Sequence, residues 1–297
     1  MTSQSPLVSI GMPVFNSEKT IVKALDSLLA QEYPNFEIII SDNASSDKTA
    51  EICKGYAQKD HRVKLHLNEK NLGINANFKI VCEKAAGKYF MWAAGDDFWE
   101  TEFVAVLARE LESDPRLGVA LSAVRRQYPD GRLVDTVTFD EQNNPNKLSN
   151  LRIAAKLLSP REKIKDLKYN LFICGLFRYE AVKSVLNLGD NILSYGERAF
   201  LSPIALGYGF RYVERVLFVK TVYETTFKQR NPDDTYVRNK KNIKYWKYYF
   251  RIMGWIAKSP DIPLKRRFFF LVIMYYITYK LTYKLKKKFG FVQQAGQ

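Results

Sequence analysis

Acidic residues follow two apolar segments within the first hundred residues of the chain. Asp96 and Asp97 come just after the segment Tyr89–Ala94. Asp42 comes just after a second such segment, Phe36–Ile40. Short apolar segments of this kind predict buried strands, and open α/β sheets bind ligands at the edge where parallel strands end. Adjacent carboxylates at that edge suit a hard divalent cation, which commonly shares its coordination shell with substrate phosphates.

The elements that must position these acids alternate between strand and helix. Strands are predicted at Leu7–Phe15, Phe36–Ser41, Val63–Leu67 and Tyr89–Ala94, and helices after Ser17, after Asp47 and at Asn75–Ala86. This order implies a mostly parallel sheet covered by helices on both faces. The later elements are predicted at Glu100–Ser113 (helix), Leu117–Gln127 (strand), Glu180–Leu186 and Tyr195–Leu206 (helices), and Arg211–Val219 and Thr221–Thr225 (short strands).

Five short segments stand in an order and spacing typical of one enzyme family. They are Val8–Asn16, Ile40–Asp47, Asn71–Asn77, Ala85–Tyr89 and Gly95–Asp97. Together they resemble the nucleotide-sugar domain of the family 2 glycosyltransferases. The resemblance implies an α/β chain with the GT-A fold, in which helices flank a Rossmann-like, mostly parallel central sheet. Residues 1–100 are then expected to form the nucleotide-sugar-binding half of the domain, and residues 101–235 the acceptor-binding half.

The resemblance assigns the nucleotide contacts to strand ends and to the loops behind them. Asp42 matches the family's base-contacting aspartate, and a carboxylate can accept the imide N–H of uracil, which favours a UDP-linked donor. The chain reads Asp42-Asn43-Ala44-Ser45 where many relatives read Asp-Asp-Gly-Ser. The alternative is that Asp42 and Asp47 only cap a helix, and that the asparagine loop is a plain turn with a cap. The other residues expected to bind the nucleotide sugar are Pro13, Val14, Phe15, Asn16, Glu18, Asn43, Asn71, Gly73, Asn77 and Asp96.

Two further roles follow from the resemblance, those of a metal ligand and a general base. Asp97 is expected to ligate Mn²⁺ or Mg²⁺ together with Asp96, so that the ion offsets charge on the leaving diphosphate. Ala94 stands where the longer form of the motif has its first aspartate, and a helix N-cap is the alternative for the pair. Glu197 is expected to take the proton of the acceptor hydroxyl in a single inverting displacement. Asp190 is the second candidate, and an ion pair or a first-turn acid is the alternative role for Glu197.

Cysteine usage and the amino terminus bear on the compartment. The three cysteines, Cys53, Cys82 and Cys174, are far apart and odd in number, which favours reduced thiols over a disulfide framework. The first six residues lack the basic and apolar regions of a secretory signal. We therefore expect a cytoplasmic protein.

The charge of the chain is concentrated near its carboxyl end. Residues 238–288 hold 15 Lys and Arg and one acid, so they carry nearly all of the net charge of +15. The uncharged run 268–279 has 12 residues, too few for a membrane-spanning helix of roughly 20 residues. Residues 236–297 are therefore predicted to form a basic, amphipathic helical extension on an anionic membrane surface. A packing helix or an oligomer interface is the alternative, and without any nucleic-acid motif we expect no nucleic acid partner.

The combined reading is an inverting, metal-dependent glycosyltransferase, peripheral on the inner face of the cell membrane. It would move a sugar from a nucleoside diphosphate sugar to a hydroxyl of a lipid-linked glycan in surface-polysaccharide assembly. One alternative is a polyprenyl-phosphate glycosyltransferase, whose phosphate acceptor needs no base. Another is a non-catalytic nucleotide-sugar-binding or scaffold protein, which the alanines at positions 44 and 94 favour. The absence of the Gln-x-x-Arg-Trp motif and of multiple apolar segments long enough to span a membrane disfavours the processive synthase branch.

Overall fold

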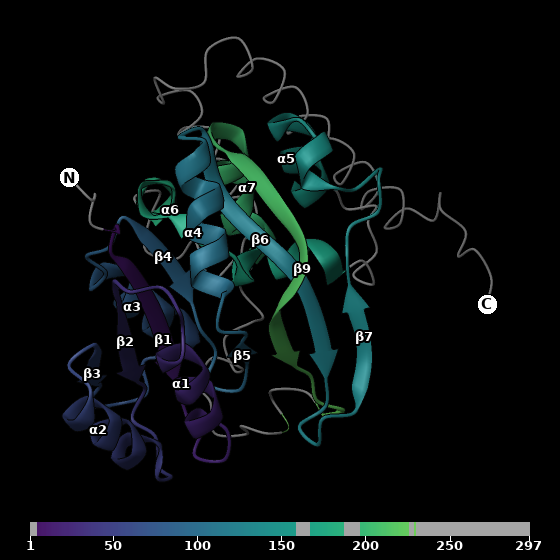
Figure 1. The fold of residues 1–297 in the computed structure, drawn as a ribbon. Helices are drawn as coiled ribbons and strands as arrows, with labels where there is room; N and C mark the ends of the chain where they lie inside the picture. The colour runs from purple at the N-terminus through teal and green to yellow at the C-terminus, as the bar shows by residue number, and fades with distance from the viewer. Residues whose placement is uncertain (1–4, 159–166, 187–196, 226–228, 230–297) are drawn as a thin grey trace, which may run out of the picture.

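The computed structural model describes residues 5–158, 167–186, 197–225 and 229, and its described part forms one mixed sheet covered by helices (Figure 1). The strands run in the order β3-β2-β1-β4-β8-β6-β9-β5, and β7 pairs with β6 off this path. Their bounds are β1 Val8–Val14, β2 Phe36–Asp42, β3 Val63–Leu67, β4 Tyr89–Trp92, β5 Phe98–Trp99, β6 Leu117–Gln127, β7 Leu133–Val137, β8 Leu176–Arg178 and β9 Gly209–Thr221.

The first four strands of this order are parallel, and the three inner ones, β2, β1 and β4, are deeply buried, whereas only Val63 of the edge strand β3 is buried. Every residue of β2 and β4 is buried, as expected when helices cover both faces of a parallel sheet. In the register of β1, β2 and β3, Val14 lies opposite Asp42, and Asp42 lies opposite Leu67. The three strands therefore end level with one another, which brings the residues that follow them to one edge. This confirms the predicted α/β sheet.

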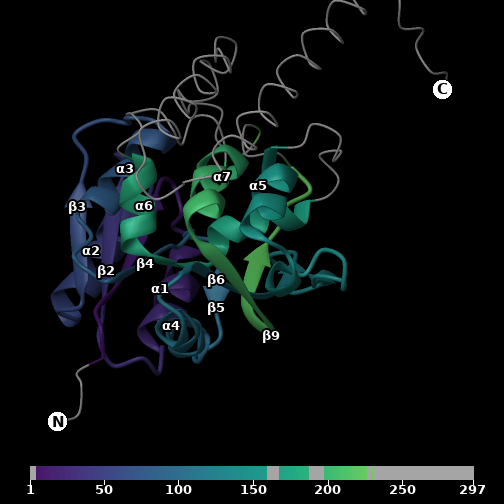
Figure 2. The same cartoon turned by 90° about the horizontal axis from the view of Figure 1, so that it is seen from above.

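Helices form a layer on each face of the sheet (Figure 2). Helices α1, α2 and α4 pack on one face, where Leu25, Cys53 and Leu107 are in one buried cluster. Helices α3, α5, α6 and α7 pack on the other, where Val81 and Ile204 are in a second cluster. Their bounds are α1 Ile21–Leu29, α2 Thr49–Lys59, α3 Ile74–Glu83, α4 Phe103–Ser113, α5 Asn150–Leu158, α6 Tyr179–Leu186 and α7 Glu197–Gly207, with the 3₁₀ segments Pro145–Lys147 and Leu167–Cys174.

The structure departs from the predicted elements just after the acidic pair. The sequence predicts a helix from Glu100, and a helix cap is one alternative for Asp97. In the structure the short strand β5 follows Asp97, and α4 begins only at Phe103. β5 pairs antiparallel with β9, which continues to Thr221 instead of breaking after Val219. This pairing excludes the capping role for Asp97 and brings the end of β9 beside it.

Parts of the predicted organisation lie outside the described residues. These are Asp190 and the basic extension 236–297. Within the described ranges, no helix is both long enough and apolar enough to cross a bilayer. The division into halves at residues 100 and 235 stays a prediction.

Candidate functional site

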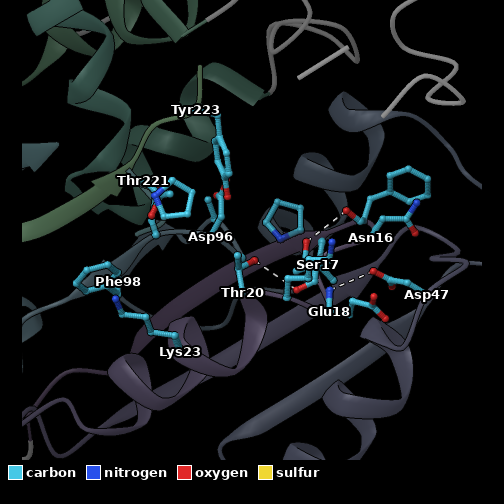
Figure 3. Close-up of a pocket in the computed structure, with 18 of the residues that line it drawn as sticks. Asn16, Ser17, Glu18, Thr20, Lys23, Asp47, Asp96, Phe98, Thr221 and Tyr223 are labelled. Carbon is cyan, nitrogen blue, oxygen red and sulfur yellow. Dashed lines mark hydrogen bonds between the residues drawn. The ribbon is translucent and has the colours of Figure 1, made fainter. Parts of the chain in front are cut away.

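A cavity of about 840 Å³ opens where β1 and β4 end, beside the end of β9 (Figure 3). Its volume is in the range of small-molecule sites. Figure 3 shows Asp96, Thr221 and Tyr223 on one side of it, and Asn16 and Asp47 on the other. The predicted site residues that line it are Pro13, Val14, Phe15, Asn16, Glu18, Asn43, Asn77, Asp96 and Asp97. Three others, Asp42, Asn71 and Gly73, are not part of the lining.

The loop after β1 is fastened to the loop after β2. Asn16 has the left-handed φ of 48°, which asparagine tolerates better than most residues. Its backbone N–H donates to Ser45 Oγ at 2.9 Å. Two residues on, the backbone N–H of Glu18 donates to Asp47 Oδ2 at 3.1 Å. These contacts hold one wall of the cavity in place, the wall whose residues are predicted from sequence to bind the nucleoside.

Asp42 is turned into its own loop and is only 2% exposed. Its Oδ1 accepts from Ser45 Oγ at 2.5 Å, and its Oδ2 accepts from the Ser45 backbone N–H at 3.0 Å. Ala44, inside this turn, has a φ of 58°. Asn43, the next residue after Asp42, lines the cavity instead. A direct contact of Asp42 with the base stays a prediction.

Buried asparagines support the same wall from behind. Asn77 Nδ2 donates to the carbonyls of Ser41 at 2.9 Å and Val14 at 3.3 Å, so it ties β1 to β2. Asn43 Nδ2 donates to Asn71 Oδ1 at 2.8 Å. An amide can donate and accept at once, which makes these residues suitable for holding strand ends at a fixed spacing.

Gly73 completes the same turn just before α3. Its φ of 83° is in the region that favours glycine. Its backbone N–H donates to Asn71 Oδ1 at 2.8 Å. The structure thus brings Asn71, Gly73 and Asn77 together with Asn43, but of these four only Asn43 and Asn77 line the cavity, and their contact with the nucleotide stays a prediction.

Asp97 makes a buried ion pair with a lysine that the sequence analysis missed. Its side chain is 3% exposed, its Oδ1 accepts from the Thr221 backbone N–H at 2.8 Å, and its Oδ2 accepts from Lys220 Nζ at 3.2 Å. The side chain of Lys220 is 35% exposed. The contact joins residues 123 positions apart, so only the pairing of β5 with β9 reveals it.

The ionisation of this pair follows from its surroundings. Burial, reinforced by the charge of Asp96, raises the pKa of Asp97 to about 6, although Lys220 and the Thr221 amide act in the opposite direction. The charge of Asp97 raises the pKa of Lys220. Near neutral pH both partners are therefore charged.

A lysine ammonium already lies beside Asp97, where the sequence predicts a divalent ion. Each Asp97 oxygen accepts one hydrogen bond, from Thr221 or from Lys220, so a lone pair on each stays available, but an ion on Oδ2 would be repelled by the ammonium. Within the described ranges no three His, Cys, Asp or Glu side chains gather to hold a metal. Mn²⁺ or Mg²⁺ at Asp96 and Asp97 stays a prediction from sequence, and no step below depends on it.

The predicted base lies at the start of a helix that packs on the sheet face opposite to α1, α2 and α4. Glu197 is the first residue of α7. Its side chain is outside what the structure describes, so its role as the base stays a prediction.

The arrangement of strands and helices is similar to that of solved glycosyltransferases. The structure of S. aureus TarS residues 1–349 in complex with UDP-GlcNAc matches with a TM-score of 0.59 and 20% identity, over 87% of this chain and 69% of that one. A mannosyltransferase from Pyrobaculum calidifontis, in complex with GDP-Man and Mn²⁺, matches with a TM-score of 0.54 and 17% identity, over 88% and 67%. At these identities the likeness shows the GT-A fold alone.

Sequence relatives point the same way. EpsJ of Bacillus subtilis, described as an uncharacterized glycosyltransferase, is 29% identical over 215 residues, which are 71% of this chain and 58% of EpsJ. An uncharacterized glycosyltransferase of Haemophilus influenzae is 43% identical over 93 residues, 31% of this chain and 37% of its own. The glycosyltransferase GlyA of Streptococcus pneumoniae is 32% identical over 104 residues, 35% of this chain and 15% of GlyA. The matches thus span between 15% and 58% of these relatives.

A further match by sequence is to a family as a whole. The sequence model described as "Glycosyl transferase family 2" matches residues 9–186, which is more than half of the chain. The matched range runs from β1 to the end of α6 and contains every cavity-lining residue that was predicted from sequence. The chain belongs to glycosyl transferase family 2.

Proposed function

We propose that this chain transfers a sugar, with inversion, from a nucleoside diphosphate sugar to a hydroxyl group of a glycan. The observation that carries the proposal is the cavity at the carboxyl edge of the parallel strands, with Asp96 and Asp97 in its wall. Its volume suits a ligand of this size. Further support comes from TarS, described in complex with UDP and UDP-GlcNAc, and from the mannosyltransferase described with GDP-Man. A uridine donor is our first choice, because Asn43, just after β2, lines the cavity and its amide can pair with uracil.

We infer a division of work between the two sides of the cavity. The wall of Asn16 and Asn43 would hold the nucleoside, because its amides and backbone groups are fixed by the contacts with Ser45 and Asn71. The side with Asp96 and the end of β9 would hold the diphosphate and sugar. A hydroxyl that attacks the anomeric carbon opposite the leaving diphosphate inverts that centre, and Glu197 is our candidate to take its proton.

The cofactor is the part of the proposal for which the observations disagree. One neighbour of the same fold is described with Mn²⁺, which supports a divalent ion at Asp96 and Asp97. The ion pair of Asp97 with Lys220 counts against it. A bound ion would supply positive charge to the leaving diphosphate, and the residues that would hold it are these two aspartates.

The proposal is tested by donor hydrolysis. Purified protein is incubated with UDP-, GDP- and dTDP-sugars, each with Mn²⁺ or with EDTA, and release of the free nucleoside diphosphate is measured. We expect one donor class to be hydrolysed, and Asp96→Asn to lose most of that activity. The matched control is Lys64→Gln, an ion-paired residue of β3 away from the cavity. If no donor releases its diphosphate, also after membrane extract is added as a source of acceptor, the transferase proposal fails.

The acceptor side is tested at Glu197. A base for a sugar hydroxyl predicts that Glu197→Gln lowers kcat strongly, while the affinity for the donor stays the same. Normal transfer by this variant would contradict a hydroxyl acceptor with Glu197 as the base. It would favour transfer to a polyprenyl phosphate, which has no such proton to lose.

We further propose that residues 236–297 attach the protein to an anionic membrane surface, near a lipid-linked acceptor of surface-polysaccharide assembly. The support is the 15 basic residues and the short apolar run within 238–288. Flotation of the full chain with phosphatidylglycerol vesicles should exceed that with phosphatidylcholine vesicles, and added salt should reduce it. Equal recovery with both kinds of vesicle would contradict the proposal.

A further inference from the structure

The ion pair of Lys220 and Asp97 places a positive charge beside a residue that lines the cavity. Asp97 lines the cavity, and Lys220 Nζ lies 3.2 Å from its Oδ2. Thr221, the next residue of β9, lines the cavity as well. A lysine ammonium thus lies next to a carboxylate that the sequence analysis assigned to a metal. Lys220 itself is not among the lining residues, which include Lys19 and Lys23.

This ammonium is attached to a rigid part of the fold. β9 pairs with β5 through Val219 opposite Phe98, and the Thr221 backbone N–H donates to Asp97 at 2.8 Å. The backbone on both sides of Lys220 is therefore held against the backbone around Asp97. The lysine side chain is a flexible stem of four carbons. Because 35% of this side chain is exposed, the ammonium can leave Asp97 for a nearby anion.

We propose that Lys220 binds the leaving diphosphate and neutralises its charge, in the place where other proteins of this fold hold a divalent ion. This inference rests on the proposed function. During transfer the bond between the anomeric carbon and the diphosphate oxygen breaks, and its electron pair stays on that oxygen. The acceptor oxygen forms the new bond and its proton goes to the base. Lys220 gains and loses no proton in this scheme, and its ammonium donates hydrogen bonds to the diphosphate oxygens as their charge grows.

Asp97 has a defined part in this arrangement. Without a nucleotide it is the partner of the ammonium, which is why a lysine can stand at a partly buried position. When a diphosphate binds, the ammonium is shared between Asp97 and the phosphate oxygens. Asp97 is then a positioning residue, and Lys220 is the group that touches the substrate.

The test measures binding by titration calorimetry, with UDP and UMP as probes, in EDTA and in Mn²⁺. For the wild type we expect UDP to bind in EDTA about as tightly as in Mn²⁺. Charge-assisted hydrogen bonds are among the stronger ones, so Lys220→Gln should bind UDP about tenfold more weakly in EDTA, which corresponds to about 1.4 kcal/mol. UMP lacks the second phosphate, and its affinity should hardly change.

Two matched variants separate charge from structure. Lys220→Arg keeps the positive charge and should keep most of the affinity for UDP. Lys64→Gln removes a lysine that is also paired with a buried carboxylate, Glu37, but away from the cavity, and should bind UDP like the wild type. If Lys220→Gln does not fold, Asp97→Asn is compared with the double variant Asp97→Asn/Lys220→Gln, and the double variant should again bind UDP about tenfold more weakly.

The inference is overturned if wild-type binding of UDP disappears in EDTA and returns with Mn²⁺, since a metal would then carry the charge. It is also overturned if Lys220→Gln binds UDP in EDTA as the wild type does. If neither UDP nor GDP binds in any condition, the proposed function itself fails and the inference fails with it. Binding that depends on metal leaves the transferase standing, so the two failures can be told apart.

Discussion

Two buried carboxylates lie at opposite edges of the same sheet, and their surroundings differ. Glu37, near the start of β2, is 4% exposed, and Asp97, after β4, is 3% exposed. Glu37 accepts from Ser9 Oγ at 2.6 Å, from Lys64 Nζ at 2.5 Å and from the Ala86 backbone N–H at 3.2 Å. Asp97 accepts from the Thr221 amide and from Lys220, and it has the charge of Asp96 beside it.

The pKa values of the two acids move in opposite directions. Burial favours the neutral form of Glu37, but the bonds from Lys64, Ser9 and Ala86 outweigh it and lower the pKa. For Asp97 burial prevails, and the pKa is raised to about 6. A carboxylate whose charge is fully compensated stabilises the fold, whereas one that is compensated less well is typical of a functional site. From this comparison we expect a structural role at the amino edge and a role in the chemistry at the carboxyl edge.

The largest effect that this comparison predicts is on activity at Asp97. Asp97→Asn should lower kcat about 100-fold or more, the size of effect seen when a preorganised charged or polar group of an active site is lost. Its unfolding free energy should stay within about 1 kcal/mol of the wild type, because the amide oxygen still accepts from Thr221 and Lys220 can turn to water. Turnover of the donor found by hydrolysis and urea unfolding measure the two quantities. A variant that is unstable but fully active would reverse the assignment.

Glu37→Gln should show the opposite pattern. The amide oxygen can still accept from Ser9 and Ala86, which both bond Oε1, but the charge-assisted bond from Lys64 to Oε2 is lost, and hydrogen bonds to charged groups are worth about 2 kcal/mol each. We expect the unfolding free energy to fall by about 2 kcal/mol and kcat to stay unchanged at a temperature where the variant is folded. Urea unfolding gives the first value and donor turnover the second. A large loss of kcat with normal stability would show that the amino edge also serves the chemistry.

Acid should remove the stability that Glu37 provides. The folded protein holds the pKa of Glu37 below its usual value, so the contribution is complete above the unfolded pKa and disappears as pH falls through the folded pKa. The difference in unfolding free energy between the wild type and Glu37→Gln should therefore be full near about pH 7 and shrink towards about pH 3. Urea titrations at a series of pH values measure it. A difference that does not change with pH would mean that the charge of Glu37 contributes nothing.

The sequence predicts the carboxyl edge better than the contacts within it. Buried apolar segments locate β1, β2 and β4 from local pattern alone, and the residues that follow them, such as Asn16, Asn43 and Asp96, come together because parallel strands end at one edge. The same reasoning does not predict that Lys220 lies at this edge. Its contact with Asp97 spans 123 positions and depends on the two-residue strand β5, which is too short to give a periodic signal.

Side-chain direction is the second thing that local pattern does not fix. Asp42 and Asn43 are adjacent at the end of β2, and the sequence assigns the nucleotide to both. In the structure the carboxylate of Asp42 turns to Ser45, while Asn43 lines the cavity. Neighbouring residues of a strand point to opposite sides, but Asn43 lies just beyond the end of β2. The conformation of the following loop therefore determines which of the two side chains faces the ligand.

The smallest effect concerns strain at the carboxyl edge. Ala44 has a φ of 58°, a conformation that costs a residue with a Cβ roughly 1 kcal/mol and glycine nothing. Ala44→Gly should therefore raise the unfolding free energy by about 0.5 kcal/mol, after the greater freedom of unfolded glycine is subtracted. The matched control is Ala57→Gly within α2, which should lower it by about 1 kcal/mol. Urea unfolding of both variants tests this prediction, because the same substitution must change the unfolding free energy in opposite directions at the two positions. A loss of stability in both variants would show that the turn after Asp42 holds no strain.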